Sequence, residues 1–555
     1  MKKKIKHIAI TLIVLIAVNV IGNGVFKRFD LTKDKRYTLS ESTITIIENV
    51  DAPIVIDVFL DGDDFPSEFR RLQAETKQLL EEFSNINNNI IFSFINPLED
   101  EATHDQNIKQ LNNRGLTPMQ LSVNESGKSS KAIIFPWALA SFHDQTVSIP
   151  LIKNKIGASQ QELVSNSVQH LEYAFADGFS KLTKPKRNKI AILKGNQQLD
   201  DIYIADFVKK LGEYYYIAPF TLDSVATNAQ KTLNDLNTFD LIISAKPTEA
   251  FSEEEKLVLD QFTMNGGKSL WLLDAVAIEK DSLYNDAGKN YAVSRDLNLT
   301  DFFFKYGIRI NPSLVADLYS APIMLATGQD NDTRFMRLRW PYSPLAKGNP
   351  HHPITNNLNL VKFDFANQID TLKNSVKKTV LLRSSELSKL EGVPREINLE
   401  IATKEPETAS FNKGNQILAV LLEGEFNSAY KNLIKPLKLE DIKDQSPLTK
   451  MIVIADGDII RNNVDRNGPT DLAFDRSSNQ EVGNKEFLLN AVNYLLDDNG
   501  LINIRSKEIA VAFLNQQKIV AEKTKWQLIN TTLPLVLLAL FGFVFNFIRK
   551  KKYAS

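Results

Sequence analysis

Hydrophobic residues gather near the two ends of the chain in long runs without charge. Residues 8–26 read IAITLIVLIAVNVIGNGVF, and residues 528–548 read LINTTLPLVLLALFGFVFNFI. A helix needs about 20 apolar residues to cross the hydrocarbon core of a bilayer, and both runs have that length. We therefore predict two transmembrane helices. The alternatives are a cleaved signal peptide for the first run and a buried core helix for the second.

Short basic segments flank these two runs. Residues 1–7 contain four lysines, and residues 549–555 contain one arginine and three lysines. Two spans place both ends of a chain on the same side, and basic tips favour the cytoplasm. We predict a two-pass protein of the bacterial inner membrane with its central region in the periplasm. Basic residues also follow the first run, from Lys27 to Arg36, so charge alone leaves the direction of that helix open.

Between the runs, β-branched segments alternate with segments of helical periodicity. The first elements that we predict are strand 53–60, helix 69–83, strand 90–95, a helix that ends at Asn113 before Arg114-Gly115, strands 119–123, 131–136 and 146–151, and helix 159–182. With Pro118 before the third strand, this β-α-β-α-β-β-α order resembles the thioredoxin fold, in which the corresponding proline is cis. The chain has no cysteine, so such a domain would be a binding scaffold and not an oxidoreductase.

A polar linker at 184–188 (KPKRN) precedes a second set of alternating elements. They are strand 189–193, helix 203–212, strands 215–219 and 241–244, helix 253–264, strands 269–273 and 451–455, and helix 485–496. Strands that alternate with helices predict βαβ units and a parallel sheet. We interpret the whole as a Rossmann-like α/β domain with a β-rich insertion at about 296–415.

The predicted organisation therefore has eight parts. They are a cytoplasmic tip at 1–7, a transmembrane helix at 8–26, a juxtamembrane neck at 27–52, a thioredoxin-like domain at 53–183, a Rossmann-like domain at 189–500, a stalk at 501–527, a transmembrane helix at 528–548 and a cytoplasmic tip at 549–555. We expect the neck to lie against the membrane surface with Tyr37 and Leu39 as anchors, and the stalk to be helical. A flexible tether is the alternative for both.

Composition narrows the functional classes. The chain of 555 residues is 43% hydrophobic and 24% charged, as in ordinary globular proteins, and its net charge of -1 gives no sign of a nucleic-acid partner.

Gly266-Gly267-Lys268-Ser269 ends like a phosphate-binding loop. The glycine that the full motif requires is replaced by Phe262, and a helix precedes the segment where a strand should stand. A helix C-cap is the better interpretation.

Two other motifs invite a catalytic or metal-binding interpretation. Asp456-Gly457-Asp458 follows a strand, as many metal-binding acids do, but a polar turn explains it more simply. His351 and His352 are adjacent, so in an extended loop their side chains point in opposite directions, and solvated or capping imidazoles are favoured over shared metal ligation. We assign no catalytic, cofactor-binding or metal-binding residue and no cofactor, and we expect the protein not to be an enzyme.

Several segments carry a family resemblance. They are 28–42 (RFDLTKDKRYTLSES), 69–83, 94–97 (FINP), 251–274 (FSEEEKLVLDQFTMNGGKSLWLLD) and the two terminal spans. Together they resemble the auxiliary, so-called substrate-binding, components of gliding-motility ABC transporters, the GldG family. The resemblance implies a non-ATPase subunit that partners an ABC permease and a cytoplasmic ATPase. It also implies a second domain similar to intraflagellar-transport and glutamine-amidotransferase-like modules, without the amidotransferase cysteine.

Two other functional classes remain as alternatives to a transporter subunit that binds a substrate or an envelope partner. One is a structural scaffold of the cell envelope with no transported ligand, and the other is a degenerate enzyme with residual hydrolase activity. A polar pocket between the two domains would favour ligand binding, and a broad exposed apolar face would favour the scaffold. Clustered acids of perturbed pKa in a cleft would favour the enzyme.

Overall fold

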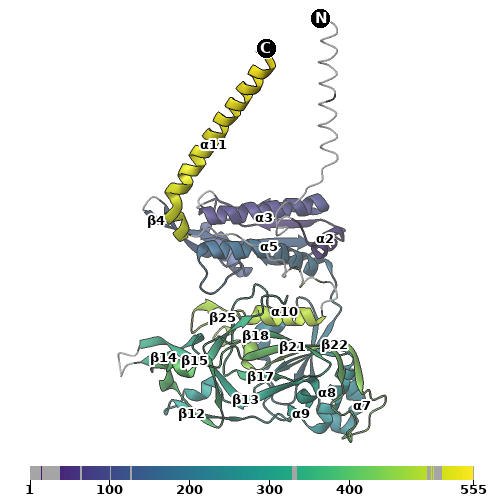
Figure 1. Ribbon diagram of the computed structural model, residues 1–555. Coiled ribbons are helices and arrows are strands. Elements are labelled where there is room, and N and C mark those ends of the chain that lie inside the picture. The colour runs from purple at the N-terminus through teal and green to yellow at the C-terminus, as the bar shows by residue number, and fades with distance from the viewer. Residues whose placement is uncertain are drawn as a thin grey trace. The chain divides into compact units, whose positions relative to one another are not determined.

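The computed structural model describes residues 38–62, 65–100, 102–125, 128–327, 334–496 and 516–553, with the single positions 14, 500, 502 and 504. It comprises two units, one formed by Met1–Arg36 with Ile509–Ser555 and the other by Tyr37–Glu508. The first predicted transmembrane helix, 8–26, lies outside the described residues apart from Val14. The second unit, called the soluble unit below, contains two lobes joined by residues 184–188 (Figure 1).

The C-terminal segment is one long helix, α11 (Gln516–Tyr553). Its stretch Glu522–Lys552 is long and apolar enough to cross a membrane, with a mean hydropathy of 2.2 in its most apolar part. The helix predicted at 528–548 is therefore present. It begins twelve residues earlier than predicted, within the predicted stalk, and Pro534 lies inside it.

The first lobe is built on a four-stranded sheet in the order β2-β1-β5-β6. β1 and β2 are parallel, and the other neighbours are antiparallel. The elements of this lobe are α2 (Glu41–Glu48), β1 (Ile54–Val58), α3 (Ser67–Ile86), β2 (Ile90–Phe94), α4 (His104–Asn113), β3 (Met119–Glu125), β4 (Lys128–Ile134), β5 (Trp137–Phe142), β6 (Gln145–Pro150) and α5 (Gln160–Thr183).

Helices α3 and α5 pack together over one face of this sheet. Phe83 of α3 meets Phe175 and Phe179 of α5 edge-on, with ring centroids 6.2 and 5.7 Å apart. Helix α5 begins with a capping box in which Ser159 and Glu162 bond to each other's backbone N–H groups. Helix α4 lies on the opposite face and ends at the Arg114-Gly115 stop that the sequence predicts.

Two details of the first lobe differ from prediction. Strands β3 and β4 pair with each other as a separate hairpin, and the sheet instead contains β5, whose sequence WALASF was not predicted as a strand. The proline directly before the third strand of the sheet is therefore Pro136, not Pro118. Among the described residues the cis peptide bond is Val393–Pro394, so the cis proline of the thioredoxin resemblance has no counterpart there.

The second lobe contains a parallel sheet covered by helices on both faces. Its parallel strands run in the order β8-β7-β9-β10-β22, which confirms the predicted βαβ arrangement. They are β7 (Lys189–Lys194), β8 (Tyr216–Thr221), β9 (Leu241–Ala245), β10 (Lys268–Leu272) and β22 (Gln445–Ile454). The carboxyl ends of β9, β10 and β22 consequently meet at one edge of the sheet.

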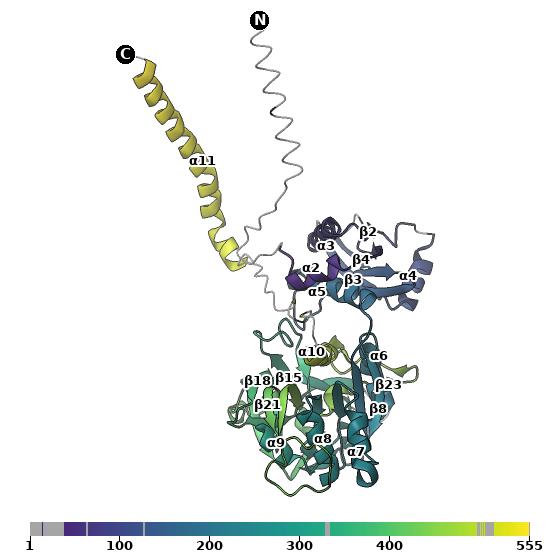
Figure 2. The same cartoon turned by 90° about the vertical axis from the view of Figure 1, so that its right-hand side faces the viewer.

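Two helices pack on one face of this sheet and three on the other. Helices α6 (Asp201–Leu211) and α10 (Asn484–Leu496) share one apolar core with the sheet. Helices α7 (Val225–Leu236), α8 (Glu253–Met264) and α9 (Thr300–Tyr306) share the other. Both views place α10 on the side of the second lobe that faces the first lobe (Figures 1 and 2). Of these helices, α7 and α9 were not predicted.

A strand-rich segment between β10 and β22 extends one edge of the sheet through β21, β18, β15 and β14. It runs from Val276 to Asn427, which is longer than the predicted 296–415. Its strands are β11 (Val276–Ala277), β12 (Lys289–Ser294), β13 (Ile308–Asp317), β14 (Ser320–Thr327), β15 (Arg334–Gly348), β16 (Val361–Lys362), β17 (Asn367–Thr371), β18 (Lys377–Arg383), β19 (Ser388–Gly392), β20 (Arg395–Asn398) and β21 (Ile417–Asn427). Short strands β23 (Val464–Asp465), β24 (Gly468–Pro469), β25 (Phe474–Asp475) and β26 (Gln480–Glu481) follow β22.

The first lobe also holds residues from both ends of the soluble unit. Glu172 of α5 accepts hydrogen bonds from the backbone N–H of Ser40 at 2.7 Å and from the hydroxyl of Thr43 at 2.9 Å. Leu39 packs against the core of this lobe, and Ile504 is buried in the same core. Part of the predicted neck therefore belongs to the first lobe, and Leu39 anchors the chain to protein.

Candidate functional site

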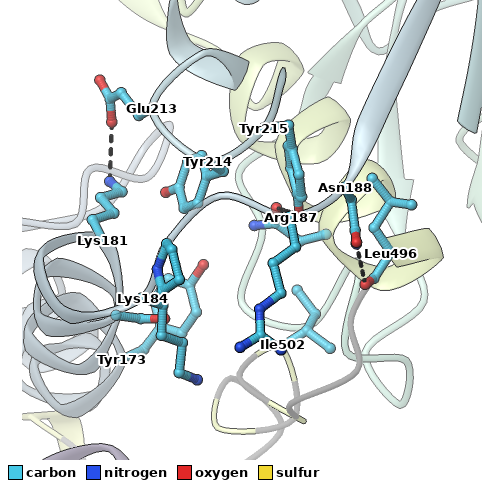
Figure 3. A pocket seen from close by; sticks show the side chains of 13 residues that line it. Tyr173, Lys181, Lys184, Arg187, Asn188, Glu213, Tyr214, Tyr215, Leu496 and Ile502 are labelled. Atoms are coloured by element: carbon cyan, nitrogen blue, oxygen red, sulfur yellow. Dashed lines mark hydrogen bonds and ion pairs between the residues drawn. The ribbon is translucent and has the colours of Figure 1, made fainter. Parts of the chain in front are cut away.

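A polar pocket lies where the two lobes join, and we call it the junction pocket (Figure 3). Its volume is about 290 Å³. The end of α5 and the 184–188 linker form one side, the residues after α6 form another, and the end of α10 with Ile502 closes it. Both lobes therefore contribute to its wall, and so does the segment that continues toward α11.

The two chain connections between the lobes meet at this pocket. The linker 184–188 leads into the second lobe, and the chain leaves that lobe after Leu496. The side-chain amide of Asn188 donates to the carbonyl oxygen of Leu496 at 3.2 Å, so entry and exit are adjacent (Figure 3). A change in the angle between the lobes would bend both connections at this point.

An ion-pair network crosses from α5 to the second lobe beside the pocket. The ammonium of Lys181 lies 2.9 Å from the carboxylate of Asp177 and 3.2 Å from that of Glu213. Glu213 also binds Lys210 at 2.7 Å, and the hydroxyl of Tyr214 donates to Asp177 at 3.0 Å. This network ties the lobes together.

Burial and charge act in opposite directions on the titration of this network. Burial alone would lower the pKa of Lys181, but the carboxylates of Asp177 and Glu213 raise that pKa above its ordinary value. Burial would raise the pKa of Glu213, but Lys181 and Lys210 lower it below the ordinary glutamate value. Lys181 and Glu213 are therefore both charged at neutral pH.

Three tyrosines give the pocket aromatic walls. Tyr173 of α5 is largely buried, and Tyr214 lies under the ammonium of Lys181, which is 4.6 Å from the ring centroid. The hydroxyl of Tyr215 donates to the side-chain oxygen of Asn493 at 2.8 Å. Burial, followed by the charge of Asp177, raises the pKa of the Tyr214 hydroxyl well above its ordinary value, so this group is neutral and acts as a donor.

Residues 184–188 supply the other charged side chains of the pocket wall. Lys184 and Arg187 line the pocket, are exposed, and extend toward the same side of it (Figure 3). The ammonium of Lys186 donates to the carbonyl oxygen of Gly212. The sequence analysis describes 184–188 only as a polar linker. Five basic residues lie between positions 181 and 189, and this local density of positive charge is the sequence signal that could have indicated the pocket.

A second cluster of charged residues lies at the carboxyl ends of β9, β10 and β22. The ammonium of Lys246 lies 2.6 Å from Asp458, 2.6 Å from Glu279 and 3.7 Å from Asp274. Arg295 lies 3.4 Å from both Asp274 and Glu279. Arg461 adds a third cation, 3.7 Å from Asp458 and 4.0 Å from Glu279. Three cations thus pair with three carboxylates, and the strand-rich segment that carries Glu279 and Arg295 is joined to the parallel sheet.

The turn predicted at Asp456–Asp458 is present within this cluster. The carboxylate of Asp456 accepts hydrogen bonds from the backbone N–H groups of Asp458 and Asp364, both at 2.6 Å. Burial raises the pKa of Asp458 to about 6, and the charge of Lys246 opposes that rise. Burial also raises the pKa of Asp456, and the neighbouring carboxylates of Asp274 and Asp458 add to that rise.

The other two motifs have the local roles that the sequence favours. Helix α8 ends at Met264, Gly266 takes a left-handed conformation with φ of 94°, and strand β10 follows, so the glycine pair is a helix stop. His352 is a capping residue, because its Nδ1 accepts a hydrogen bond from the backbone N–H of Ile354 at 3.3 Å. His351 is exposed.

Comparison with known proteins places the chain in a family. Residues 187–491, more than half of the chain, match the model of the auxiliary family described as an ABC-type uncharacterized transport system. The chain belongs to this family. It is thus an accessory component of an ABC-type transport system, which confirms the broader part of the predicted resemblance. Residues 33–141 match a domain of unknown function.

Two individual similarities accompany the family match. An uncharacterized protein of Borreliella burgdorferi (strain ATCC 35210 / DSM 4680 / CIP 102532 / B31) is 22% identical over 550 residues, which cover 98% of this chain and 97% of that protein. The solved mmIFT52 N-terminal domain is 12% identical with a TM-score of 0.31, over 56% of this chain and 98% of that one. At that TM-score the similarity does not establish a shared fold.

Proposed function

We propose that this chain is a non-ATPase, membrane-anchored subunit of an ABC transport complex that binds a substrate or an envelope partner. Its partners in the proposal are an ABC permease and a separate cytoplasmic ATPase. Because the chain resembles the GldG family, we propose that this complex serves gliding motility. The soluble unit then stands in the periplasm, held in the inner membrane by α11 and by the helix predicted at 8–26.

The observation that carries this proposal is the position of the junction pocket. The pocket is lined by charged and tyrosine side chains, lies between the two lobes, and occupies the place where both connections meet. Ile502 forms part of its wall, Ile504 is buried in the first lobe, and the chain then continues to α11. A ligand in the pocket would favour one angle between the two lobes.

The lobe architecture supports a binding scaffold. The first lobe joins a parallel β1-α3-β2 unit to the antiparallel pair β5 and β6 with α5 last, an order that supports the proposed thioredoxin-like fold. Without cysteine it has no redox chemistry of the thioredoxin kind. The second lobe is Rossmann-like in its parallel sheet.

We assign no catalytic role to the carboxylates at the strand ends. Lys246 and Arg295 pair with Asp274 and Glu279, and Asp456 is occupied by backbone N–H groups. The side chain of Lys246 is only 3% exposed. These acids hold the strand ends together through ion pairs and backbone hydrogen bonds, which favours a structural role over a catalytic one.

A structural scaffold is the second candidate, and the β14–β15 hairpin favours it. Phe335 is 73% exposed and Met336 49% exposed, next to the exposed residues Arg337 and Arg339. Phe335 and Met336 are consecutive in β15 and so expose one apolar side chain on each face of the hairpin, next to the edge strand β14, where a partner strand or surface can pack. Such a surface suits an envelope partner in either candidate function.

The proposal is tested by co-purification from native membranes. The chain carries a tag on its C-terminal tip, the membranes are dissolved in mild detergent, and the co-purifying proteins are identified by mass spectrometry. We expect an ABC permease and its ATPase. Recovery of other envelope proteins without either one would refute the transporter subunit and favour the scaffold.

A further inference from the structure

Strand β2 forms an open edge of the four-stranded sheet in the first lobe, because among the described residues it pairs with β1 alone. The backbone N–H of Ile95 donates to β1 at 2.9 Å, and the carbonyl oxygen of Asn89 accepts a hydrogen bond from β1 at 2.8 Å. Successive residues of a strand direct their backbone groups to opposite sides, so the odd-numbered residues of 89–95 face β1. The N–H and C=O groups of Phe92 and Phe94 therefore point outward, where another strand can bind them.

Both faces of this edge are apolar. Ile91 and Ile95 are 50% and 37% exposed on one face. Phe92 and Phe94 lie on the other face, partly packed against the core of the first lobe, with ring centroids 6.2 Å apart. Residues 84–98 carry no charge. An exposed apolar edge of this kind is a template for pairing with another chain, which proteins usually prevent with lysine, proline or a bulge.

The other edges of the two large sheets contain proline. These edges are β6, β8 and β14, and their prolines are Pro150, Pro219 and Pro322. Proline has no N–H donor, so it limits the ladder that an added strand can form. Of these four described edges, β2 is the one without a proline. Strand addition is therefore favoured at β2.

The sequence of this edge indicates which strand fits it. Residues 91–95 read Ile-Phe-Ser-Phe-Ile, a palindrome centred on Ser93. In an antiparallel pair of two copies centred on this serine, isoleucine lies opposite isoleucine and phenylalanine opposite phenylalanine. The outward backbone groups of Phe92 would exchange hydrogen bonds with those of Phe94 in the other copy. The edge is thus complementary to itself, as a two-fold symmetric contact requires.

We propose that β2 pairs antiparallel with β2 of a second copy of this chain, so that two four-stranded sheets join into one continuous sheet. The hydroxyl of Ser93 donates to Asp57 of β1 at 2.8 Å, so its donor is satisfied within each copy. The contact uses residues of the first lobe and does not involve the junction pocket. The proposal therefore adds a second copy to the proposed transport complex, whatever ligand that complex binds.

The test is disulfide formation in native membranes. The chain has no cysteine, so a single introduced thiol is unique within it. Opposite residues of a non-hydrogen-bonded antiparallel pair have Cα atoms about 4.5 Å apart, which a disulfide can bridge. Two differently tagged copies of the full chain, both Ser93→Cys, are expressed together and oxidised with copper phenanthroline. The matched control is Ser148→Cys, which changes an exposed serine of β6 at the opposite edge of the same sheet.

We expect Ser93→Cys to give a disulfide-linked dimer that carries both tags, and Ser148→Cys to remain monomeric. Addition of Ile91→Lys to Ser93→Cys should abolish the dimer, because it places a charge opposite Ile95 of the second copy. Addition of Val55→Lys should leave the dimer intact. Val55 is 44% exposed and lies beside Ile91 in the register, but it belongs to β1 and not to the edge.

Three results would overturn the contact between copies. The first is no more dimer from Ser93→Cys than from Ser148→Cys, and the second is a dimer that Ile91→Lys leaves unchanged. The third is a cross-link from Ser93→Cys to a different protein, which would assign the edge to that protein. Melting temperatures verify that each variant is folded, and the two cysteine variants decide the question if Ile91→Lys unfolds the lobe. Co-purification with the permease and ATPase is measured separately, so failure of this contact is distinguishable from failure of the proposed function.

Discussion

Lys246 combines an unusual backbone with a buried charge. Its φ of 54° lies in the left-handed region, which residues with side chains seldom adopt, and it stands directly after β9. The conformation lets its ammonium reach Asp458 and Glu279. The network thus compensates a local backbone cost of about 1 kcal/mol.

Replacement of this lysine should be strongly destabilising. Lys246→Met would remove the cation that lies 2.6 Å from both Asp458 and Glu279. Arg295 would remain 3.4 Å from Glu279 and Arg461 3.7 Å from Asp458. The loss should therefore lie near the lower end of the about 3–5 kcal/mol that breaking a buried ion pair on one side costs. Thermal unfolding of the purified chain measures the loss. The control is Lys404→Met, an exposed pair with Glu400 that should change stability by less than about 0.5 kcal/mol. Equal losses would contradict a central role for Lys246.

The raised pKa of Asp458 predicts how stability depends on pH. In the folded chain the pKa is about 6, against an ordinary value of 3.8. Between these values the folded state binds more protons than the unfolded state, so stability falls as the pH rises through this window. The raised pKa values of Asp274 and Asp456 act in the same direction.

Asp458→Asn should therefore flatten this dependence. Melting temperatures at pH values from about 4 to about 7 compare the variant with the unmodified chain. The matched control is Asp281→Asn, which removes an exposed carboxylate that pairs with Arg461. Arg461 also lies 3.7 Å from Asp458, so both variants remove a carboxylate beside the same guanidinium. The control should keep the original slope. An unchanged slope in Asp458→Asn would show that the carboxyl does not titrate in this window.

At the scale of elements, helix α2 depends on one carboxylate of α5. Glu172→Ala should remove the acceptor for Ser40 and Thr43 and cost about 2–3 kcal/mol, because Thr43 is fully buried. The rate of backbone amide hydrogen exchange should rise more at residues 41–48 than in α5. Glu48→Ala changes an exposed residue of α2 and should leave exchange unchanged. Slow exchange in Glu172→Ala would mean that Ile46 and Ile47 alone hold the helix.

Helix and strand boundaries were predictable where a local signal marks them. Helix α8 has the predicted bounds because Ser252 and Glu255 form a capping box and Gly266 ends it. Strand β5 was missed because its buried positions hold Ala138, Leu139 and Ala140, without β-branched residues. Helix α7 was missed in a sequence rich in polar residues, and Asn228 interrupts it with a non-helical backbone.

The junction pocket could not be predicted from the sequence. Its wall joins Tyr173, Tyr214 and Ile502, which are separated by up to 329 positions in the sequence, and only the packing of two lobes brings them together. Part of the charged cluster at the carboxyl ends of β9, β10 and β22 could be predicted, because Asp456 and Asp458 directly follow a predicted strand. Lys246, which pairs with Asp458, lies in a different strand loop and belongs to no motif.

At the scale of the whole soluble unit, one lobe is inserted into the other. The first lobe contains residues from α2 to α5 and also the buried Ile504, so its sequence is interrupted by the entire second lobe. The two points of interruption touch through Asn188 and Leu496. The ends of the soluble unit that continue toward the hydrophobic segments are therefore both fixed to the first lobe.

A lobe whose two ends are adjacent can be replaced as a unit without disturbing the rest of the chain. Evolution can enlarge, replace or delete such a lobe while the remaining chain keeps its fold and its attachment, because the gap left behind is short enough to close. We therefore expect homologues to differ most in the length of the segment between Asn188 and Leu496. The joint itself, from Lys181 to Asn188, should vary least.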